Sequence, residues 1–347
     1  MSIDFSCGVS RSRRSSAWGM LLSVLLLAAI PAHAHTSLPG YLALQETGPG
    51  SFDLVWKVPT AEGPPPAIYP VFPPACTIAK PLVAEQAPGA MIERGGIQCG
   101  AGGLDGAAIA ISGLNVTILD VLVRITFADG SSVQHMLKPL ETSFVVHKDG
   151  KNRIDAWGYI SLGVGHILYG IDHLLFVLGL LLIVQGLGPL LRTITAFTVA
   201  HTITLGLAVF GVVHIAPVPV EAVIALSIVF LAVELAQHHR GKDRGKEGLT
   251  FRQPWIVAFA FGLLHGFGFA GTLSKLGIPS SDIPQSLLFF NVGVEAGQLA
   301  FVAVFLTFVY SLRSLEIRWP AWTHRVPAYA MGSVASFWFL QRCAIIF

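Results

Sequence analysis

The sequence predicts a mainly α-helical, polytopic membrane protein, in which a small β-sandwich-like extracytoplasmic domain precedes a bundle of six transmembrane helices. Two observations indicate this fold class. Hydrophobic residues make up 53% of the chain and charged residues only 12%, whereas soluble domains contain about 25% charged residues. The polar stretches are also confined to particular segments, which divides the chain into a targeting region, a soluble domain and a membrane domain. A net charge of +2 without a long basic run gives no footprint for a nucleic-acid partner.

Residues 1–34 have the pattern of a secretory signal peptide. Three arginines precede an apolar run from Met20 to Ile30, and the small-x-small sequence that ends at Ala34 follows. This pattern predicts cleavage after Ala34. A membrane anchor is the competing interpretation, although the run is short for a span. Cleavage would make His35 the mature N-terminus, where an α-amine and an imidazole could chelate a metal together; a solvated histidine is the simpler interpretation.

Residues 35–152 have the pattern of a soluble, β-rich domain. Partial alternation of apolar and polar residues indicates strands with one buried face. The predicted strands cover residues 41–46, 52–58, 117–127 and 132–137. The last two flank Asp129-Gly130 and predict a hairpin. The proline-rich stretch 63–88 predicts a long surface excursion rather than a regular element.

Two of the four cysteines are candidates for a disulfide. Cys76 and Cys99 lie in the domain predicted to face an oxidising compartment. Cys7 leaves with the signal peptide, and Cys343 lies in an apolar C-terminal segment. The lack of a CxxC pair argues against a zinc site in the soluble domain.

The membrane domain is expected to cover residues 153–347. Its hydropathy pattern predicts six spans, at residues 157–185, 191–212, 218–237, 254–276, 284–312 and 326–346. Orientation follows from the positive-inside rule. The opposite loops, at residues 213–218 and 277–283, contain only Asp282 as a charged residue, whereas the loops expected to face the cytoplasm carry Arg192, Arg240, Lys242, Arg244, Lys246, Arg252, Arg313, Arg318 and Arg325. We therefore expect a bacterial inner-membrane protein whose N-terminal domain and C-terminus are both extracytoplasmic.

The first predicted span contains ionisable residues that are costly in hydrocarbon. His166 and His173 lie about 20° apart on a helical wheel, with Gly170 between them on the same face. Asp172 points about 100° away, where it either binds a metal or orients an imidazole. Because such groups inside a membrane mark functional sites, this face predicts a pair of metal ligands beside a gap. Packing histidines that are hydrogen-bonded within the bundle are the alternative interpretation.

Other spans place polar groups at similar depth. His201 and His265 lie near the middle of the second and fourth spans, and glycines flank His265. In the fifth span, Asn291, Glu295 and Gln298 form one polar stripe. The third span opens with Glu221 and holds Ser227 further in. A helical bundle does not need these groups, but a path for a hydrophilic solute does.

The metal-ligand candidates form a set of nitrogen and oxygen donors without a thiolate. They are His166, Asp172, His173, His201, His265 and Glu295, and their supporting residues are Gly170, Glu221, Ser227, Asn291 and Gln298. Such donors suit Ni²⁺, Co²⁺ or Zn²⁺ better than Cu⁺, and histidine argues against Mg²⁺ or Ca²⁺. The chain has no nucleotide-binding motif, so the energy for transport must come from the membrane potential, a proton exchange or a partner.

Five sequence blocks in the membrane part resemble the HupE/UreJ family. They are Gly165-His-x-x-x-Gly-x-Asp-His173, Phe197-Thr-x-Ala-His201-Thr, Val220-Glu-Ala-x-Ile-Ala-Leu-Ser227, Phe261-Gly-Leu-x-His265-Gly and Phe290-Asn-x-Gly-Val-Glu295. The resemblance is to the branch with a signal peptide and an N-terminal extracytoplasmic domain. It implies nickel or cobalt uptake and a metal-binding role for His166, Asp172 and His173. Ile167 replaces the proline typical of founding members, which leaves the substrate and the direction of transport open.

The sequence therefore predicts a permease for a divalent transition-metal cation, most directly nickel or cobalt. The cation is the substrate, and no resident cofactor or enzymatic activity is expected. Membrane lipid surrounds the helices, and an extracytoplasmic metal carrier or other protein is a candidate partner of the outer domain. One alternative is a zinc-dependent intramembrane hydrolase that uses His173, His201 and His265 as ligands, Asp172 as a base and Ser227 as an oxyanion partner. A non-transporting membrane accessory protein is the other.

Overall fold

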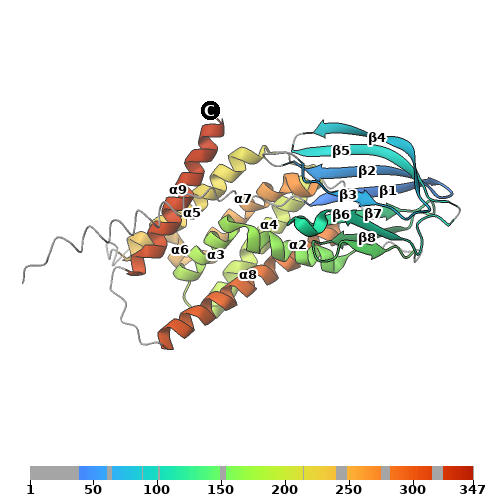
Figure 1. Cartoon of the computed structure of the whole chain (residues 1–347). Helices are drawn as coiled ribbons and strands as arrows, with labels where there is room; N and C mark the ends of the chain where they lie inside the picture. The colour runs from blue at the N-terminus through green and yellow to red at the C-terminus, as the bar shows by residue number, and fades with distance from the viewer. Residues whose placement is uncertain are drawn as a thin grey trace, which may run out of the picture. The chain divides into compact units, whose positions relative to one another are not determined.

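The structure is a computed structural model in which a β-rich domain is followed by a set of α-helices (Figure 1). It describes residues 39–60, 65–87, 89–100, 102–148, 154–213, 215–239, 248–274, 282–314 and 323–346. The predicted signal peptide, Cys7 and His35 lie outside these residues. The same holds for most of the basic residues used to orient the membrane domain.

Two sheets form the β-rich domain. The larger sheet has the strand order β4-β5-β2-β1-β7-β8, and the smaller has the order β3-β6-β9. The strands are β1 (Gly40–Gly48), β2 (Ser51–Pro59), β3 (Tyr69–Val71), β4 (Thr77–Ala87), β5 (Ala90–Gln98), β6 (Ala108–Ser112), β7 (Val121–Thr126), β8 (Ser132–Leu137) and β9 (Ser143–Val145). Alternate residues of β2, including Phe52, Leu54 and Trp56, share one core with Ile109 and Ile111 of β6. The two sheets therefore enclose a common apolar layer, as in a β-sandwich.

The predicted hairpin is present, since β7 pairs antiparallel with β8 across the turn at Asp129-Gly130. The expectation that residues 63–88 form no regular element was wrong, because strands β3 and β4 both lie within this stretch. Strand β4 occupies the edge of the larger sheet and pairs with β5. Its register shifts on either side of Lys80, so Pro81 lies in an irregular part of the ladder. A strand interrupted in this way and exposed on nearly every residue shows no alternation in the sequence.

Cys76 and Cys99 form a disulfide. Cys76 directly precedes β4 and Cys99 directly follows β5, so the bond joins adjacent ends of two antiparallel strands. It closes a loop with a sequence separation of 23 residues around the exposed edge of the sheet. Because β4 contributes little to the core, the bond holds in place the least buried part of the domain.

The C-terminal part is helical. Its helices are α2 (Ala156–Tyr169), α3 (Ile171–Ile183), α4 (Leu187–Val209), α5 (Pro217–His239), α6 (Leu249–Arg252), α7 (Pro254–Ser274), α8 (Ile283–Ser314) and α9 (Val326–Ile346). Among the described residues, three helices are long and apolar enough to cross a membrane, namely α4, α5 and α8. The bent pair of α2 and α3 makes a fourth candidate span. The described part of α7, Pro254–Gly268, is apolar but shorter. A membrane protein is established, whereas six spans remain a prediction.

The first predicted span is not one continuous helix. Helices α2 and α3 meet at an angle of 74°, and Gly170 between them is extended, with φ −78° and ψ 92°. The expectation of a straight helix over residues 157–185 was therefore wrong. A break exposes backbone groups, which hydrocarbon tolerates only where protein or a polar cavity surrounds them. Here the Gly170 amide still donates to the carbonyl of His166 (3.1 Å).

Glycines bring the helices close to one another around this break. A Cβ atom on Gly163 of α2 would collide with the Phe290 carbonyl of α8, and one on Gly293 of α8 would collide with the Ile160 carbonyl of α2. On α7, a Cβ atom on Gly262 would lie 2.5 Å from the Phe197 carbonyl oxygen of α4. Small residues at helix contacts allow backbones to approach in this way. The result is two tight helix pairs, α2 with α8 and α4 with α7.

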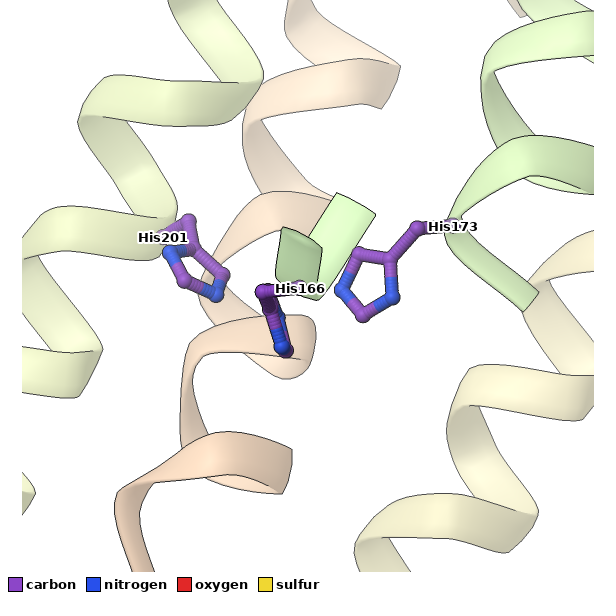
Figure 2. Close-up of side chains that lie close together, drawn as sticks. All are labelled: His166, His173 and His201. Atoms are coloured by element: carbon purple, nitrogen blue, oxygen red, sulfur yellow. The ribbon is translucent and has the colours of Figure 1, made fainter. Parts of the chain in front are cut away.

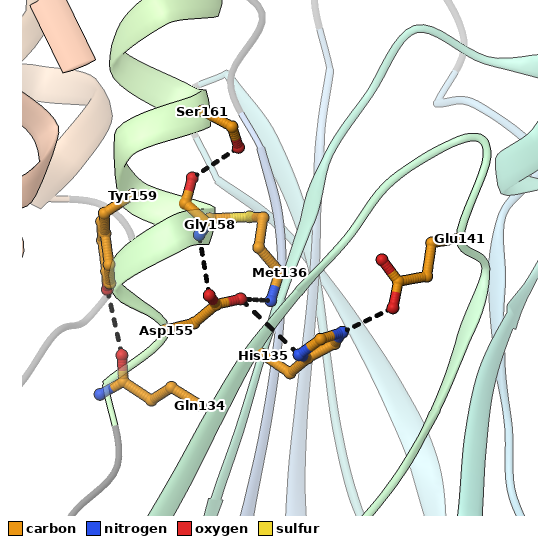
Figure 3. A network of polar contacts seen from close by, with 8 residues as sticks. All are labelled: Gln134, His135, Met136, Glu141, Asp155, Gly158, Tyr159 and Ser161. Atoms are coloured by element: carbon orange, nitrogen blue, oxygen red, sulfur yellow. Dashed lines mark hydrogen bonds and ion pairs between the residues drawn. The ribbon is translucent and has the colours of Figure 1, made fainter.

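Buried polar contacts join the larger sheet to helices α2 and α8. The Tyr159 hydroxyl of α2 donates to Gln134 of β8 (3.1 Å; Figure 3). The Gln134 amide donates to Asp282, just before α8 (2.9 Å). Asp282 also forms an ion pair with Arg124 of β7 (3.3 Å), and both side chains are largely buried. Burial raises the pKa of the nearby Tyr41 hydroxyl, an effect that Arg124 opposes and Asp282 reinforces.

Candidate metal centre

Three histidines come together where the first span breaks. His166 lies in the last turn of α2 and His173 in the first turn of α3, and their ring centroids are 4.6 Å apart. His201 reaches them from α4, with its centroid 6.0 Å from that of His166 and 6.4 Å from that of His173 (Figure 2). One potential ligand atom from each of the three lies within 4.8 Å of the others. The side chains of His173 and His201 are almost completely buried.

A fourth histidine lies beside this group. His265 of α7 has its ring centroid 5.3 Å from that of His173 and is buried. Phe176 and Phe197 pack against the His265 ring, with centroid distances of 5.0 Å and 5.1 Å. The four imidazoles therefore come from α2, α3, α4 and α7, within a wall of aromatic side chains. No single helix could supply this arrangement.

Hydrogen bonds fix the orientation of three of the rings through Nδ1. Nδ1 of His173 lies 3.0 Å from Oδ1 of Asp172, and Nδ1 of His265 lies 2.8 Å from the Phe261 carbonyl oxygen. Nδ1 of His201 lies 3.2 Å from Oδ1 of Asn291. Each partner atom is an acceptor, so Nδ1 carries the proton in each neutral ring. The lone pair for a metal is then on Nε2.

The Nε2 atoms of His173, His201 and His265 are buried and have no hydrogen-bond partner among the described residues. Buried polar groups almost always have a partner, so three such acceptors in one cluster require an explanation. A cation bound by these lone pairs supplies it. A first-row metal such as zinc lies about 2.1 Å from each imidazole nitrogen, so two ligands of one ion are at most about 4.2 Å apart. Three nitrogens spread evenly around one ion at this distance are about 3.6 Å apart, so the ligand atoms of His166, His173 and His201, which lie within 4.8 Å of one another, must draw together by up to about an ångström to bind one ion.

Comparison with known protein families finds one match. The sequence model for the family described as HupE / UreJ protein matches residues 141–342. The chain belongs to the HupE/UreJ family. That family is associated with nickel and cobalt transport. The matched region contains the four histidines of the site, helices α2 to α8 and most of α9, whereas most of the β-rich domain precedes it. No curated protein and no solved structure matches the chain.

In this HupE/UreJ protein, the atoms around Gly170 leave no room for a side chain. A Cβ atom at this position would lie 2.7 Å from the His166 carbonyl oxygen, 2.8 Å from Nδ1 of His173 and 3.2 Å from Oδ1 of Asp172. None of these contacts is relieved by moving the far end of a flexible side chain. Any larger residue at position 170 must therefore displace a ligand or the acceptor that orients it.

Asn291 acts on His201 from α8. Its Nδ2 donates to the Leu287 carbonyl (2.8 Å), which leaves Oδ1 directed at His201 as an acceptor. The sequence placed Asn291 among the supporting residues, and the structure shows its contact. Sequence analysis missed the Phe261 carbonyl that orients His265. A signal existed, because His265 follows Phe261 by four residues and the carbonyl one turn back is always within reach of a helical side chain.

The remaining predicted site residues have hydrogen-bond or ion-pair partners other than the histidines. Glu295 accepts a hydrogen bond from Thr195 (2.6 Å), and Gln298 accepts one from Thr198 (2.9 Å). Together with His201 and Asn291, these pairs form a polar line between α4 and α8. Two other predicted residues have partners on α5 and α9: Glu221 pairs with Arg342 (2.6 Å), and Ser227 donates to the Ile224 carbonyl (2.6 Å). A ligand role for Glu295 remains a prediction.

Proposed function

We propose that this protein is a permease for a divalent transition-metal cation, nickel or cobalt, in the bacterial inner membrane. The observation that carries the proposal is the cluster of buried histidines, in which Nδ1 is bound to an acceptor and Nε2 is left for a metal. In the proposed role, His166, Asp172 and His173 bind the partly dehydrated cation. His201 and His265 complete its coordination. The association of the family with nickel and cobalt transport supports this assignment.

The donor set supports a borderline metal. Imidazole nitrogens with a nearby carboxylate suit Ni²⁺, Co²⁺ and Zn²⁺, and the site offers no thiolate for Cu⁺. The rings come from helices with different neighbours, so a small relative movement changes how many of them reach one ion. A permease needs this property, because binding must be strong enough to take up the ion and weak enough to release it.

We also propose a route and a driving force. The polar line of Thr198, Gln298, Thr195 and Glu295 leads from His201 along α4 and α8, and Glu295 is the carboxylate that receives the ion. Inward movement of a divalent cation gains about 2 × 2.3 kcal/mol per 100 mV of membrane potential. That is sufficient without ATP where cytoplasmic free metal is low. In this proposal residues 35–152 form the extracytoplasmic domain and residues 153–347 the membrane domain with its C-terminus outside.

Uptake of radioactive nickel, cobalt and zinc by cells that carry the wild type or His173→Ala tests the proposal. We expect His173→Ala to abolish accumulation of the transported metal. His238→Ala is the matched control, because His238 is an exposed histidine of α5 that stacks on Phe251 outside the cluster. Immunoblots of the membrane fraction establish equal expression. Equal accumulation of all three metals in His173→Ala and wild-type cells would refute the permease.

Metal retention separates the permease from the zinc hydrolase. A hydrolase purifies with tightly held zinc and keeps it through dialysis, whereas a permease loses its ion readily. The Ser227 hydroxyl, a candidate oxyanion partner in the hydrolase, donates to the Ile224 carbonyl and contributes no support for that alternative. Zinc that survives dialysis against a weak chelator, together with hydrolytic activity lost in His173→Ala, would favour the enzyme instead.

A further inference from the structure

Helix α2, which carries the first histidine of the cluster, is attached at its start to the larger sheet. Asp155 caps α2 by accepting a hydrogen bond from the Gly158 amide (2.8 Å), and its other carboxylate oxygen accepts one from the Met136 amide of β8 (2.8 Å; Figure 3). In the first turn of α2, the Tyr159 hydroxyl donates to the Gln134 side chain of β8 (3.1 Å). The start of α2 is therefore bound to one strand at two points.

The same network reaches helix α8. Gln134 accepts from Tyr159 and donates to Asp282, the residue before α8 (2.9 Å), and Asp282 forms an ion pair with Arg124 of β7 (3.3 Å). Tyr159, Gln134 and Asp282 are each at most 5% exposed. Because a buried polar group that loses its partner is costly, these contacts hold the sheet and the starts of α2 and α8 in one arrangement.

Helix α2 extends this arrangement to His166. The α2 backbone lies directly against α8, where Gly163 of α2 and Gly293 of α8 leave no room for a Cβ atom. His166 follows Tyr159 by two turns, which is about 10 Å along a helix axis. Its ring also packs against Phe290 of α8, with a centroid distance of 5.5 Å. A short helix in such close contact moves as a unit, so a displacement at Tyr159 is passed on to His166.

The other histidines belong to a separately packed group of helices. His173 lies beyond the break at Gly170, on α3, and His201 and His265 lie on α4 and α7. One apolar cluster joins these three helices to α5 and α9, and none of its members among the described residues comes from the β-rich domain or from α2. The cluster of His166, His173 and His201 therefore takes one ligand from the helix held by the sheet and two from this other group.

The position of α2 then decides how closely the three histidines approach one another. Their ligand atoms lie within 4.8 Å of one another and must draw together by up to about an ångström to bind one ion. Metal ligands have to be held within about 0.5 Å of the productive geometry. A shift of that size at the start of α2 is therefore enough to change the affinity of the site.

We propose that Tyr159 and Gln134 are positioning residues for His166. Through them the β-rich domain sets the position of α2 and thereby the distance of His166 from His173 and His201. The consequence for uptake rests on the proposed permease function, whereas the effect on metal binding does not.

Nickel binding to the purified full-length chain, measured by equilibrium dialysis in detergent, tests this role. Tyr159→Phe keeps the buried ring and removes only the hydroxyl that contacts Gln134, so we expect it to fold. Tyr159→Phe and Gln134→Leu should each raise Kd for nickel several-fold and leave the stoichiometry unchanged, because no ligand is lost. Tyr69→Phe is the matched control, since Tyr69 is an exposed tyrosine of strand β3. Wild-type Kd in both Tyr159→Phe and Gln134→Leu would overturn the proposal.

A double-mutant cycle tests whether Tyr159 acts through His166. His166→Ala retains His173, His201 and His265 and should bind nickel more weakly than the wild type. Adding Tyr159→Phe to His166→Ala should cause no further loss of affinity, because the residue that it positions is already absent. A general packing defect would instead lower the affinity by the same factor with and without His166, and that result would rule out the positioning role.

Uptake by cells separates failure of this inference from failure of the permease. If the positioning role is wrong, His173→Ala is inactive in nickel uptake while purified Tyr159→Phe binds nickel like the wild type. If the permease is wrong, His173→Ala accumulates nickel like the wild type while purified Tyr159→Phe still binds nickel more weakly.

Discussion

Replacement of Asn291 tests whether the proton position on His201 controls metal binding. Asn291 is buried, and its Oδ1 is the acceptor for Nδ1 of His201 at 3.2 Å. In Asn291→Leu the side-chain volume is similar but the acceptor is gone. Nδ1–H of His201 is then buried without a partner, and the proton gains nothing by staying there. Once it moves to Nε2, the nitrogen that faces the cluster is a donor and cannot bind a cation.

The magnitude follows from the behaviour of residues that orient metal ligands. Loss of such a partner costs 10- to 100-fold in metal affinity, or about 1.4 to 2.8 kcal/mol. We expect Kd for nickel in the purified protein and KM in uptake to rise by this factor in Asn291→Leu. Asn291→Asp is the matched control, because a carboxylate keeps an acceptor at the same position and should retain near-wild-type affinity.

The two variants together test whether the Asn291 acceptor makes Nε2 of His201 the metal ligand. Asn291→Leu that binds nickel as tightly as the wild type would show that His201 does not need this acceptor, and the argument for an Nε2 ligand would fail. Equal weakening in Asn291→Leu and Asn291→Asp would point to a packing defect at α8 instead of a lost acceptor. Thermal unfolding of all three proteins in the same detergent detects such a defect.

Three further predictions concern other parts of the chain. Gly170→Ala should abolish nickel binding measured by dialysis. Gly165→Ala should bind nickel normally, because a Cβ atom at position 165 would meet only ring carbons at 3.7 Å. Nickel binding by both variants would refute the steric argument. Asp282→Asn should lower the free energy of unfolding by about 3 kcal/mol because it leaves a buried guanidinium without its counter-charge. Asp53→Asn, which breaks an exposed ion pair, should lower the free energy of unfolding by at most about 1 kcal/mol in the same denaturation measurement. Equal losses in the two variants would contradict a stabilising role for the buried pair of Asp282 and Arg124. Hydrogen bonds from Ser131 lower the pKa of Asp129 from 3.8 to about 2, so its stabilising contribution is complete above pH 3.8 and disappears as the pH falls through 2. Wild type and Asp129→Asn should therefore differ in denaturant midpoint at neutral pH and converge near pH 2, and a constant difference would exclude this group as the cause.

The proximity of His166 and His173 was predicted from a straight helix, whereas the helix breaks between the two residues. A straight wheel placed His166 and His173 on one face, and their rings are in fact 4.6 Å apart. The proximity comes from a 74° bend at Gly170. Periodicity cannot reveal such a bend, because a glycine in an apolar run is compatible with both a continuous and a broken helix.

Periodicity likewise did not reveal the partners of the carboxylates Glu295 and Glu221. Glu295 and Asn291 share one stripe of α8 in the sequence, yet Asn291 contacts His201 while Glu295 contacts Thr195. A stripe on one helix does not specify which residues of the neighbouring helix face it. Glu221 likewise had no predicted partner, and the structure pairs it with Arg342 from the far end of the membrane domain.

By itself, the sequence determined that this is a membrane protein with a β-rich N-terminal part and that its apolar segments contain histidines, an aspartate and polar amides. Those properties follow from composition and local periodicity, since burying an ionisable group in hydrocarbon is costly wherever the helix lies. Only the tertiary structure decided which side chains meet. Helix contacts through Gly163, Gly262 and Gly293 set the distances between spans, and those distances determine that four imidazoles converge while Glu221 and Glu295 find partners elsewhere.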